Sequence, residues 1–284
     1  LSQNNQQQKM LSYQSENSLS VDISSYGTDD YFALLDDEEG ADLLSGKMDI
    51  GVGRLWARTT DEANVLVSKI KKYIVDNQKG SWKTNLIYLA DDNPDQTNGF
   101  DLGFTYEGDF LAKQIESAYP EFTPRRMFFD AYPQVSSASS ETLPLLREKL
   151  FQQINKGVLF VNYTGHGSTE GIGNERVLSR SDISSMNNSI LPIFFTATCD
   201  FAEYDQLTSS IGKELHLKEN GGAIALITSN RSVYMAGNFS LNKAFNSLIL
   251  KRENGKSLTL GEINRRAKNQ LSDKNQLSYC LLGD

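Results

Sequence analysis

The chain has 284 residues, of which 39% are hydrophobic and 23% charged, and its formal net charge is −8. A surplus of carboxylates argues against the clustered Lys and Arg that neutralise a phosphate backbone, so we expect no nucleic-acid partner. No apolar run approaches the roughly 20 residues that cross a bilayer, so we expect no membrane span in this segment.

The first part of the chain gives weak structural signals. Residues 1–20 are rich in Gln, Asn and Ser, which bury too little apolar surface to offset the entropy of ordering, so we predict a linker or a cut end. The acidic segment 29–39 surrounds a small apolar centre, which favours a solvated surface loop or hairpin. Its carboxylates would also suit calcium, but the spacing of a calcium-binding loop is absent, so calcium is left open and not predicted.

From residue 60 onward, helical periodicity alternates with short continuous apolar runs. The periodicity predicts helices at 60–75, 109–119, 141–155, 181–186 and 209–218, and two more across 238–272. The apolar runs predict strands at 85–90, 126–131, 157–163, 190–196, 223–229 and 279–282. Strands that are apolar on both faces are typical of a mainly parallel sheet with helices on both sides, so the predicted class is α/β.

Two of the predicted strands end in residues that can carry chemistry. The strand at 157–163 runs into His166, and the strand at 190–196 runs into Cys199. Ligands of open parallel sheets bind beyond the carboxyl ends of the strands, so we expect both side chains at one crevice. A thiolate attacks carbonyl carbons and an imidazole exchanges protons near neutral pH, so the pair predicts acyl transfer. The backbone N–H groups of Gly167 and Cys199 are the predicted oxyanion donors.

Several of these residues also have an ordinary structural interpretation. A cysteine at the end of an apolar strand is most often packed core, and we interpret Cys280 in the last run in this way. Acidic residues follow Cys199 up to position 205 and tend to raise the pKa of a thiol, so we do not expect a preformed thiolate. His216 is predicted to be a partly exposed structural side chain. The loop 91–93 could contact a metal or substrate, although turn chemistry explains these residues equally well.

The sequence around the two candidate residues resembles that of a known peptidase family. The blocks VNYTGHGS (161–168) and FTATCDF (195–201) are similar to the His and Cys blocks of the gingipain family, and shorter matches extend from residue 29 to residue 284. The resemblance implies a caspase-like (gingipain-type) three-layer fold, with a smaller N-terminal subdomain at 21–134 and a catalytic C-terminal subdomain at 135–284.

The resemblance also implies a cysteine endopeptidase with a dyad of Cys199 and His166 and no required cofactor. The family places a Glu near its catalytic His, and Glu107 is the matching position, ahead of the helix predicted at 109–119. A carboxylate in the first turn of a helix is equally well explained by the helix dipole. No acidic residue matches the pocket of the arginine-specific members, so specificity for Arg is not predicted.

Within the family, the motifs are most similar to those of the sortase-like signal peptidases of the type IX secretion system. This implies an exported enzyme at the outer membrane or cell surface. Its substrates would be proteins or peptides, namely the C-terminal signal domains of secreted proteins, and its partners would include outer-membrane secretion components. The acyl group would pass to water or to an amine of a surface glycolipid. The alternatives are a secreted degradative endopeptidase and a non-catalytic binding module on the same fold.

Overall fold

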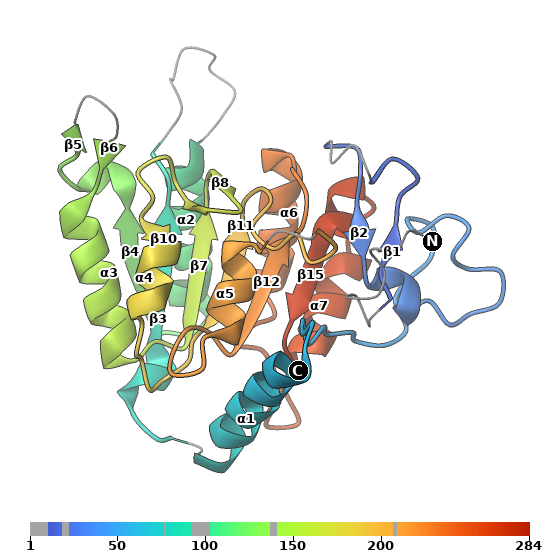
Figure 1. Ribbon diagram of the computed structural model, residues 1–284, viewed down its shortest axis with the longest axis horizontal. Coiled ribbons are helices and arrows are strands. Elements are labelled where there is room, and N and C mark those ends of the chain that lie inside the picture. Colours follow the sequence, from blue (N-terminus) through green and yellow to red (C-terminus); the bar gives the residue numbers. More distant parts are fainter. Residues whose placement is uncertain (1–10, 19–22, 77, 93–102, 137–140, 207–208) are drawn as a thin grey trace.

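A six-stranded sheet forms the centre of the molecule (Figure 1). The structure is a computed structural model, and it describes residues 11–18, 23–76, 78–92, 103–136, 141–206 and 209–284. The strand order is β15-β12-β11-β7-β3-β4; five strands run parallel, and β15 pairs antiparallel with β12. The strands are β3 (Asn85–Ala90), β4 (Thr123–Phe128), β7 (Phe160–Thr164), β11 (Ile193–Ala197), β12 (Ala225–Ser229) and β15 (Tyr279–Leu282).

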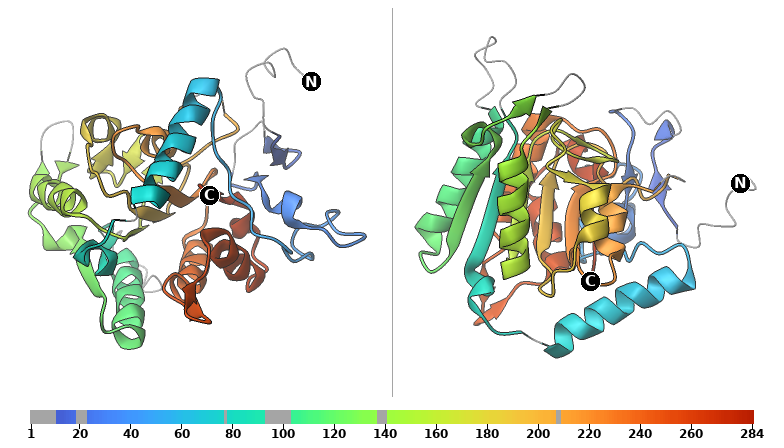
Figure 2. Two further views of the ribbon diagram at one scale, coloured as in Figure 1. Left: turned by 90° about the horizontal axis from the view of Figure 1, so that it is seen from below. Right: turned by 60° about the vertical axis from the view of Figure 1, so that its left-hand side comes forward.

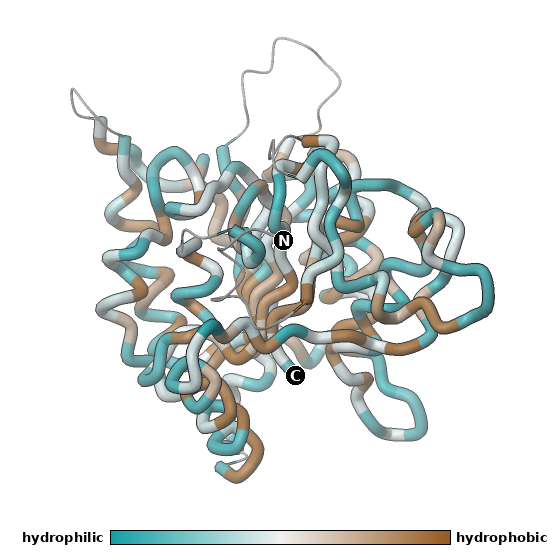
Figure 3. Tube along the Cα trace, turned by 45° about the vertical axis from the view of Figure 1, so that its right-hand side comes forward, coloured by the Kyte–Doolittle hydropathy of each residue, from teal (hydrophilic) through white to brown (hydrophobic). Residues whose placement is uncertain are grey.

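Helices cover both faces of this sheet and give the molecule three layers (Figure 2). One face packs against α3 (Pro144–Lys156), α4 (Arg180–Ser185) and α5 (Ile211–Leu217). The other face packs against α2 (Gly103–Ala118), α6 (Met235–Asn246) and α7 (Leu260–Asn269). Neighbouring strand residues such as Val161 and Phe160 point to opposite faces, and both are buried. This explains the continuous apolar runs in the sequence, which appear as brown strands at the centre of Figure 3.

The remaining elements are short, except for one long helix. That helix, α1 (Thr60–Asp76), lies beyond the edge at which the parallel strands begin (Figure 2). Buried Lys69 joins it to the body, because its Nζ donates to the carbonyl oxygens of His216 and Ala223 at 2.7 and 2.9 Å. The small strands are β1 (Tyr13–Gln14), β2 (Gly27–Thr28), β5 (Val135–Ser136), β6 (Glu141–Thr142), β8 (Gly167–Ser168), β9 (Gly171–Ile172), β10 (Leu178–Ser179), β13 (Arg252–Glu253) and β14 (Lys256–Ser257).

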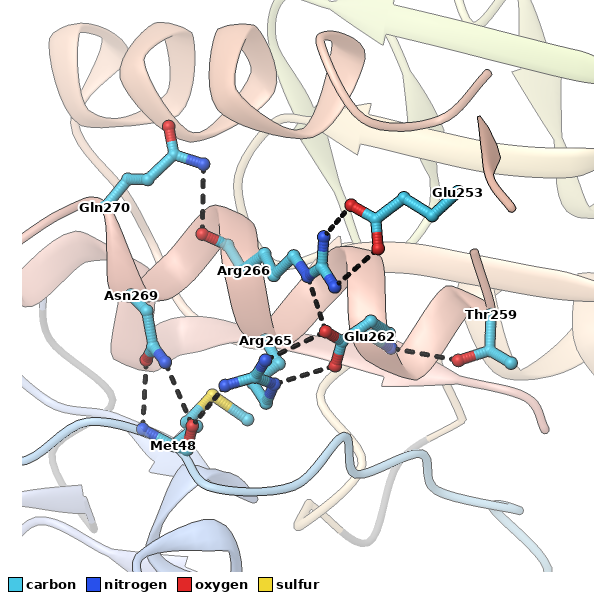
Figure 4. A network of polar contacts seen from close by, with 8 residues as sticks. All are labelled: Met48, Glu253, Thr259, Glu262, Arg265, Arg266, Asn269 and Gln270. Atoms are coloured by element: carbon cyan, nitrogen blue, oxygen red, sulfur yellow. Dashed lines mark hydrogen bonds and ion pairs between the residues drawn. The ribbon is translucent and has the colours of Figure 1, made fainter. Parts of the chain in front are cut away.

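Polar contacts of α7 hold the segment around residue 48 against the body (Figure 4). Asn269 donates to the carbonyl oxygen of Met48 and accepts from its N–H, both at 2.9 Å. Arg265 adds a bond to the same carbonyl at 3.1 Å. The helix begins where the Thr259 side chain accepts from the N–H of Glu262, which is an N-cap bond. The N-terminal part of the chain is therefore tied to the last helix.

The prediction of a solvated loop at 29–39 is wrong for its first two acids. Asp29 forms a buried ion pair with Arg54, and Asp30 is held at 2.6 Å by the buried Lys268. Each carboxylate is buried because a cation from a distant part of the chain accompanies it. A short 3₁₀ turn, Asp30–Ala33, begins at this point.

Two predicted elements are displaced along the chain. The helix predicted at 109–119 begins at Gly103, because Phe104 continues the buried face formed by Leu111 and Ile115. The strand predicted at 126–131 lies at Thr123–Phe128. The division at 134/135 stays a prediction, and strands from both sides of it pair in one sheet. Most of the predicted linker, 1–10 and 19–20, lies outside the described residues. None of the described helices combines the length and hydrophobicity needed to span a bilayer.

Candidate active site

His166 and Cys199 occupy matching positions on neighbouring strands. In the parallel pairing of β7 with β11, Thr164 lies opposite Ala197 at the carboxyl ends of both strands. His166 and Cys199 each follow this pair by two residues. Because neighbouring strands lie about 4.8 Å apart, the two residues emerge side by side at one edge of the sheet. The two strand ends are therefore neighbours, and the meeting of the His166 and Cys199 side chains in one crevice stays a prediction.

The His166 loop is held by hydrogen bonds to its backbone. The N–H of His166 donates to Asp91 Oδ2 at 2.8 Å, and its carbonyl oxygen accepts from the Tyr163 hydroxyl at 2.6 Å and from the N–H of Gly173 at 2.9 Å. The His166 side chain is exposed, and its ring meets that of Phe104 edge-on at a centroid distance of 5.3 Å. The backbone is therefore held by hydrogen bonds, while the imidazole is exposed to solvent.

The Cys199 thiol is half-buried and lies against the backbone of a third loop. The N–H of Val233 donates to Cys199 Sγ at 3.4 Å, and Sγ lies 3.5 Å from the carbonyl oxygen of the same residue. Burial raises the pKa of the thiol, and the charge of Asp200 raises it further, while the Val233 N–H lowers it. The resting thiol is thus expected to be protonated, in agreement with the sequence, although burial is the main cause.

A sharp turn follows the cysteine. Asp200 has a φ of +53°, a conformation that few side chains other than Asn and Asp adopt readily. Its N–H donates to the carbonyl oxygen of Arg231 at 3.2 Å, and its Oδ2 accepts from Ser232 at 2.7 Å. The turn directs the chain away from the strand immediately after the thiol, so Cys199 sits at the tip of the bend.

The two candidate loops touch through Gly167 and Thr198. A Cβ placed on Gly167 would lie 2.9 Å from Thr198 Cγ2 and closer still to its hydroxyl oxygen, so only glycine fits without a shift. Gly167 follows His166 directly and Thr198 precedes Cys199 directly, which makes this contact the physical link between the two loops. The role of the Gly167 and Cys199 N–H groups as oxyanion donors stays a prediction.

A buried ion pair joins the Cys199 loop to the loop that follows β12. Asp205, which follows the cysteine in the same loop, pairs with Arg231 through bonds of 2.5 and 2.8 Å, and both side chains are fully buried. Arg231 also donates to Ser25 and Ser18 in the N-terminal segment, at 3.2 and 3.3 Å. Sequence reasoning recognised the acid and missed its partner, because no local pattern connects residues 205 and 231.

Glu107 lies within α2 and not ahead of it, so the predicted position relative to the helix is wrong. The helix begins four residues earlier than this carboxylate. Glu107 is buried, and its Oε2 accepts from the hydroxyl of Thr164 at 2.8 Å. Thr164 is the last residue of the strand that leads into His166. The carboxylate therefore lies beneath the His166 loop, and a direct catalytic role stays a prediction.

Three carboxylates gather beside the His166 loop. Asp91, Asp92 and Glu175 each offer an oxygen, and these oxygens all lie within 4.8 Å of one another. Burial raises the pKa of Asp91 to about 7, with further contributions from the charges of Asp92 and Glu175. The sequence had marked the loop 91–93 for metal, substrate or turn, and residue 93 lies outside the described residues. Glu175 was missed because it lies 83 positions farther along the chain than Asp92.

Two other expectations differ in outcome. Cys280 is buried in the core, as predicted. His216 is not partly exposed: it is 1% exposed, its Nδ1 has no hydrogen-bond partner among the described residues, and burial lowers its pKa to about 3. The physical reason is that α1 covers this part of α5 through Lys69.

A cavity of about 850 Å³ opens at the opposite edge of the sheet. Its walls include Val65 and Lys69 of α1 and Leu159 and Ile193 at the beginnings of β7 and β11. None of the predicted catalytic residues lines it. The cavity is therefore separate from the strand ends that carry His166 and Cys199.

Comparison with known proteins gives consistent findings. A family model described as Peptidase family C25 matches residues 2–284. The chain is similar to a crystal structure of the Arg-specific cysteine proteinase gingipain R, with a TM-score of 0.69 and 14% identity over 91% of this chain and 58% of that one. It is similar to a complex of the RgpB pro- and mature domains from Porphyromonas gingivalis, with a TM-score of 0.69 and 14% identity over 90% and 59%.

A third structure, described as a protease, matches with a TM-score of 0.67 and 16% identity over 92% of this chain and 59% of that one. The chain thus spans less than two thirds of the length of these structures. No curated protein sequence matches it. At these identities the likeness concerns the fold, and it confirms the predicted gingipain-like α/β architecture with a mainly parallel sheet.

Proposed function

Because this chain belongs to peptidase family C25, we propose that it is a cysteine endopeptidase with Cys199 as nucleophile and His166 as acid and base. The observation that carries the proposal is the register of β7 and β11, from which both residues emerge two positions beyond one strand pair. The thiol is half-buried and the imidazole is exposed, which is consistent with access of a substrate from solvent.

The reaction follows from the chemistry of the two side chains. The thiol proton passes to His166 while Sγ bonds to the carbonyl carbon of the scissile peptide. The tetrahedral intermediate collapses as the C–N bond breaks, and the imidazolium returns its proton to the leaving amine. A thioester on Cys199 remains, and water or an amine then attacks it. The N–H groups of Gly167 and Cys199 would bind the oxyanion.

A thiol with a raised pKa favours this sequence of steps. Since burial holds Cys199 protonated, a base is needed at the moment of attack, and His166 is suited to that role. The N–H of Val233 at 3.4 Å from Sγ would stabilise the thiolate as it forms. Glu107 would act through Thr164 on the loop that carries His166, as a positioning residue. The chemistry of these residues requires no cofactor.

At a finer level, we propose a sortase-like role similar to that of PorU, the signal peptidase of the type IX secretion system. The support is the set of sequence motifs that resemble this group. Substrates would be the C-terminal signal domains of secreted proteins, the enzyme would act at the outer membrane or cell surface with secretion components as partners, and the acyl group would pass to water or to a glycolipid amine.

Active-site labelling tests the nucleophile and the base. A peptidyl ketone with a leaving group should add once to the wild type under reducing conditions, as read by intact mass. Cys199→Ala should lose the adduct and the matched variant Cys280→Ala should keep it, while His166→Asn should slow labelling and turnover by about 10²- to 10⁴-fold. An adduct on Cys280, or none at all, would remove the basis for the proposed mechanism.

Product analysis tests the sortase-like role. Incubation with a secreted protein that carries its C-terminal signal domain should give one cleavage at one junction, dependent on Cys199. Cleavage at many sites in unrelated peptide libraries would instead identify a degradative endopeptidase and contradict the sortase-like role.

A further inference from the structure

The cavity between α1 and the beginnings of the central strands has a mainly apolar wall. Its volume of about 850 Å³ lies within the range of about 300–1,000 Å³ that is usual for binding sites of small molecules. Segments that are far apart in the sequence contribute buried or half-buried side chains to this wall, among them Trp82, Phe122, Leu159, Ile193, Leu250 and Leu258. The fold thus leaves an apolar surface here that an apolar ligand could cover.

Lys69 of α1 differs from the other buried lysines of the described residues, and it also lines this cavity. Lys213 pairs with Glu62 at 2.7 Å, and Lys268 pairs with Asp30 at 2.6 Å. Lys69 is 5% exposed, and its Nζ donates to two backbone carbonyl oxygens without forming an ion pair to any described carboxylate. Burial lowers the pKa of Lys69 to about 7. A buried ammonium without a counter-ion is costly, so an anion in the cavity would stabilise it.

The other charged residues around the cavity also favour an anion. Although the chain has a net charge of −8, cationic residues outnumber acidic ones in the cavity wall. The cations are Lys69, Lys72, Lys83 and Arg252, and the acids are Asp76 and Glu219. Asp76 is already paired with Lys72 at 2.5 Å, and Glu219 is exposed. Charge and wall together therefore indicate a ligand with an apolar body and one anionic end.

We propose that this cavity binds a fatty-acid-like amphiphile, with its aliphatic chain against the apolar wall and its carboxylate held by Lys69. An ammonium has three N–H groups, and the third one of Lys69 has no acceptor among the described residues, so a carboxylate oxygen would supply it. The aliphatic chain would gain free energy by leaving water. A small polar anion such as phosphate gains nothing from the wall, so the chain is as necessary as the charge. This inference does not depend on the proposed peptidase function.

Calorimetric titration of the chain with sodium decanoate, below its micelle-forming concentration, tests the site. The wild type should bind one equivalent. Decyltrimethylammonium has the same aliphatic chain and the opposite charge, and it should bind more weakly by about tenfold or more. Octanoate is shorter by two methylene groups and should bind about tenfold more weakly than decanoate.

Substitutions test the head and the wall of the site separately. Lys69→Met removes the ammonium and should weaken decanoate binding by about tenfold or more. The matched control is Lys71→Met, which removes an exposed cation from the same helix outside the cavity and should bind as the wild type does. Because Lys69→Met also loses two hydrogen bonds that hold α1, Leu258→Trp gives a second test. It fills the cavity while Lys69 stays in place, and it should also weaken binding. Unfolding midpoints verify that each variant folds.

The outcomes are separable from those of the peptidase proposal, because Cys199→Ala should bind decanoate as the wild type does. Equal affinity for decanoate and decyltrimethylammonium, or equal binding by the wild type and Leu258→Trp, overturns the site. Equal binding by Lys69→Met and Lys71→Met overturns the role of Lys69. Decanoate that protects Cys199 from the peptidyl ketone equally in the wild type and in Leu258→Trp would place the ligand at the other edge of the sheet, which also overturns the proposal.

Discussion

The two halves of the candidate site share a backbone plan and differ in how charge supports them. His166 and Cys199 each lie two residues beyond a paired strand end. The Cys199 half rests on an acid and a base that are fully buried together, Asp205 and Arg231. The His166 half rests on Asp91, which has other carboxylates beside it. The two halves thus share a backbone geometry. An ion pair neutralises the buried carboxylate of the Cys199 half, whereas no described Lys or Arg pairs with the carboxylates of the His166 half.

Breaking the balanced half should have the largest effect. Arg231→Met leaves Asp205 as an unpaired buried charge, which should reduce the free energy of unfolding by about 3–5 kcal/mol. Denaturant unfolding measures this, and adding Asp205→Asn should recover part of the loss. The control is Arg266→Met, which removes partly exposed pairs with Glu253 and Glu262 and should change the midpoint little. Equal losses in both variants would mean that the buried pair has no special role.

The contact between the halves should give an intermediate effect. Gly167→Ala pushes a methyl group into Thr198 and should cost roughly 1–3 kcal/mol. Because the displaced backbone carries both candidate residues, labelling of Cys199 should slow by about tenfold to a hundredfold.

A second substitution tests the cause of that effect. Thr198→Ala removes the two atoms closest to the new methyl group, Oγ1 and Cγ2, and leaves Cβ at 3.2 Å, so it should restore most of the labelling rate in the double variant. Gly261→Ala, where the added Cβ meets its neighbours at 3.4 Å or more, should behave as the wild type. Failure of Thr198→Ala to rescue would mean that the loops are not coupled through this contact.

The unbalanced half should give the smallest effect, as a change in pH dependence. Burial, with Asp92 and Glu175 nearby, raises the pKa of Asp91 to about 7 from an ordinary value near 3.9. The folded state then holds a proton more tightly than the unfolded state, so this carboxyl stabilises the fold least above pH 7 and progressively more as the pH falls towards 4.

Asp91→Asn should flatten that trend, since Asn keeps an acceptor for the His166 N–H and does not titrate. In EDTA, Tm should fall between pH 5 and pH 8 by more in the wild type than in the variant. The hydroxyl of Tyr163, 3.3 Å from the same carboxylate, stays protonated over this range because burial raises its pKa well above its usual value. Identical slopes would show that Asp91 is ionised throughout.

Sequence could predict the parts of this site that depend on local pattern. Apolar runs identified the strands, and the rule that ligands bind beyond the carboxyl ends of parallel strands brought His166 and Cys199 together. Contacts between distant segments were beyond reach. Neither the pairing of Asp29 with Arg54 nor the covering of His216 by α1 leaves a periodic signal, and both changed a predicted exposed residue into a buried one. Glu107 was placed near His166 but outside its helix, because helix boundaries are weakly encoded.

Arg231 connects the Cys199 loop to segments that are distant in the sequence. Its guanidinium contacts Ser18 and Ser25, more than 200 positions away, and the N–H of the preceding Asn230 donates to the carbonyl oxygen of Ser278 at 2.8 Å. Contacts of such high sequence separation form late, because long loops must close first. We therefore expect the loop of the proposed nucleophile to be assembled only after these distant segments have come together.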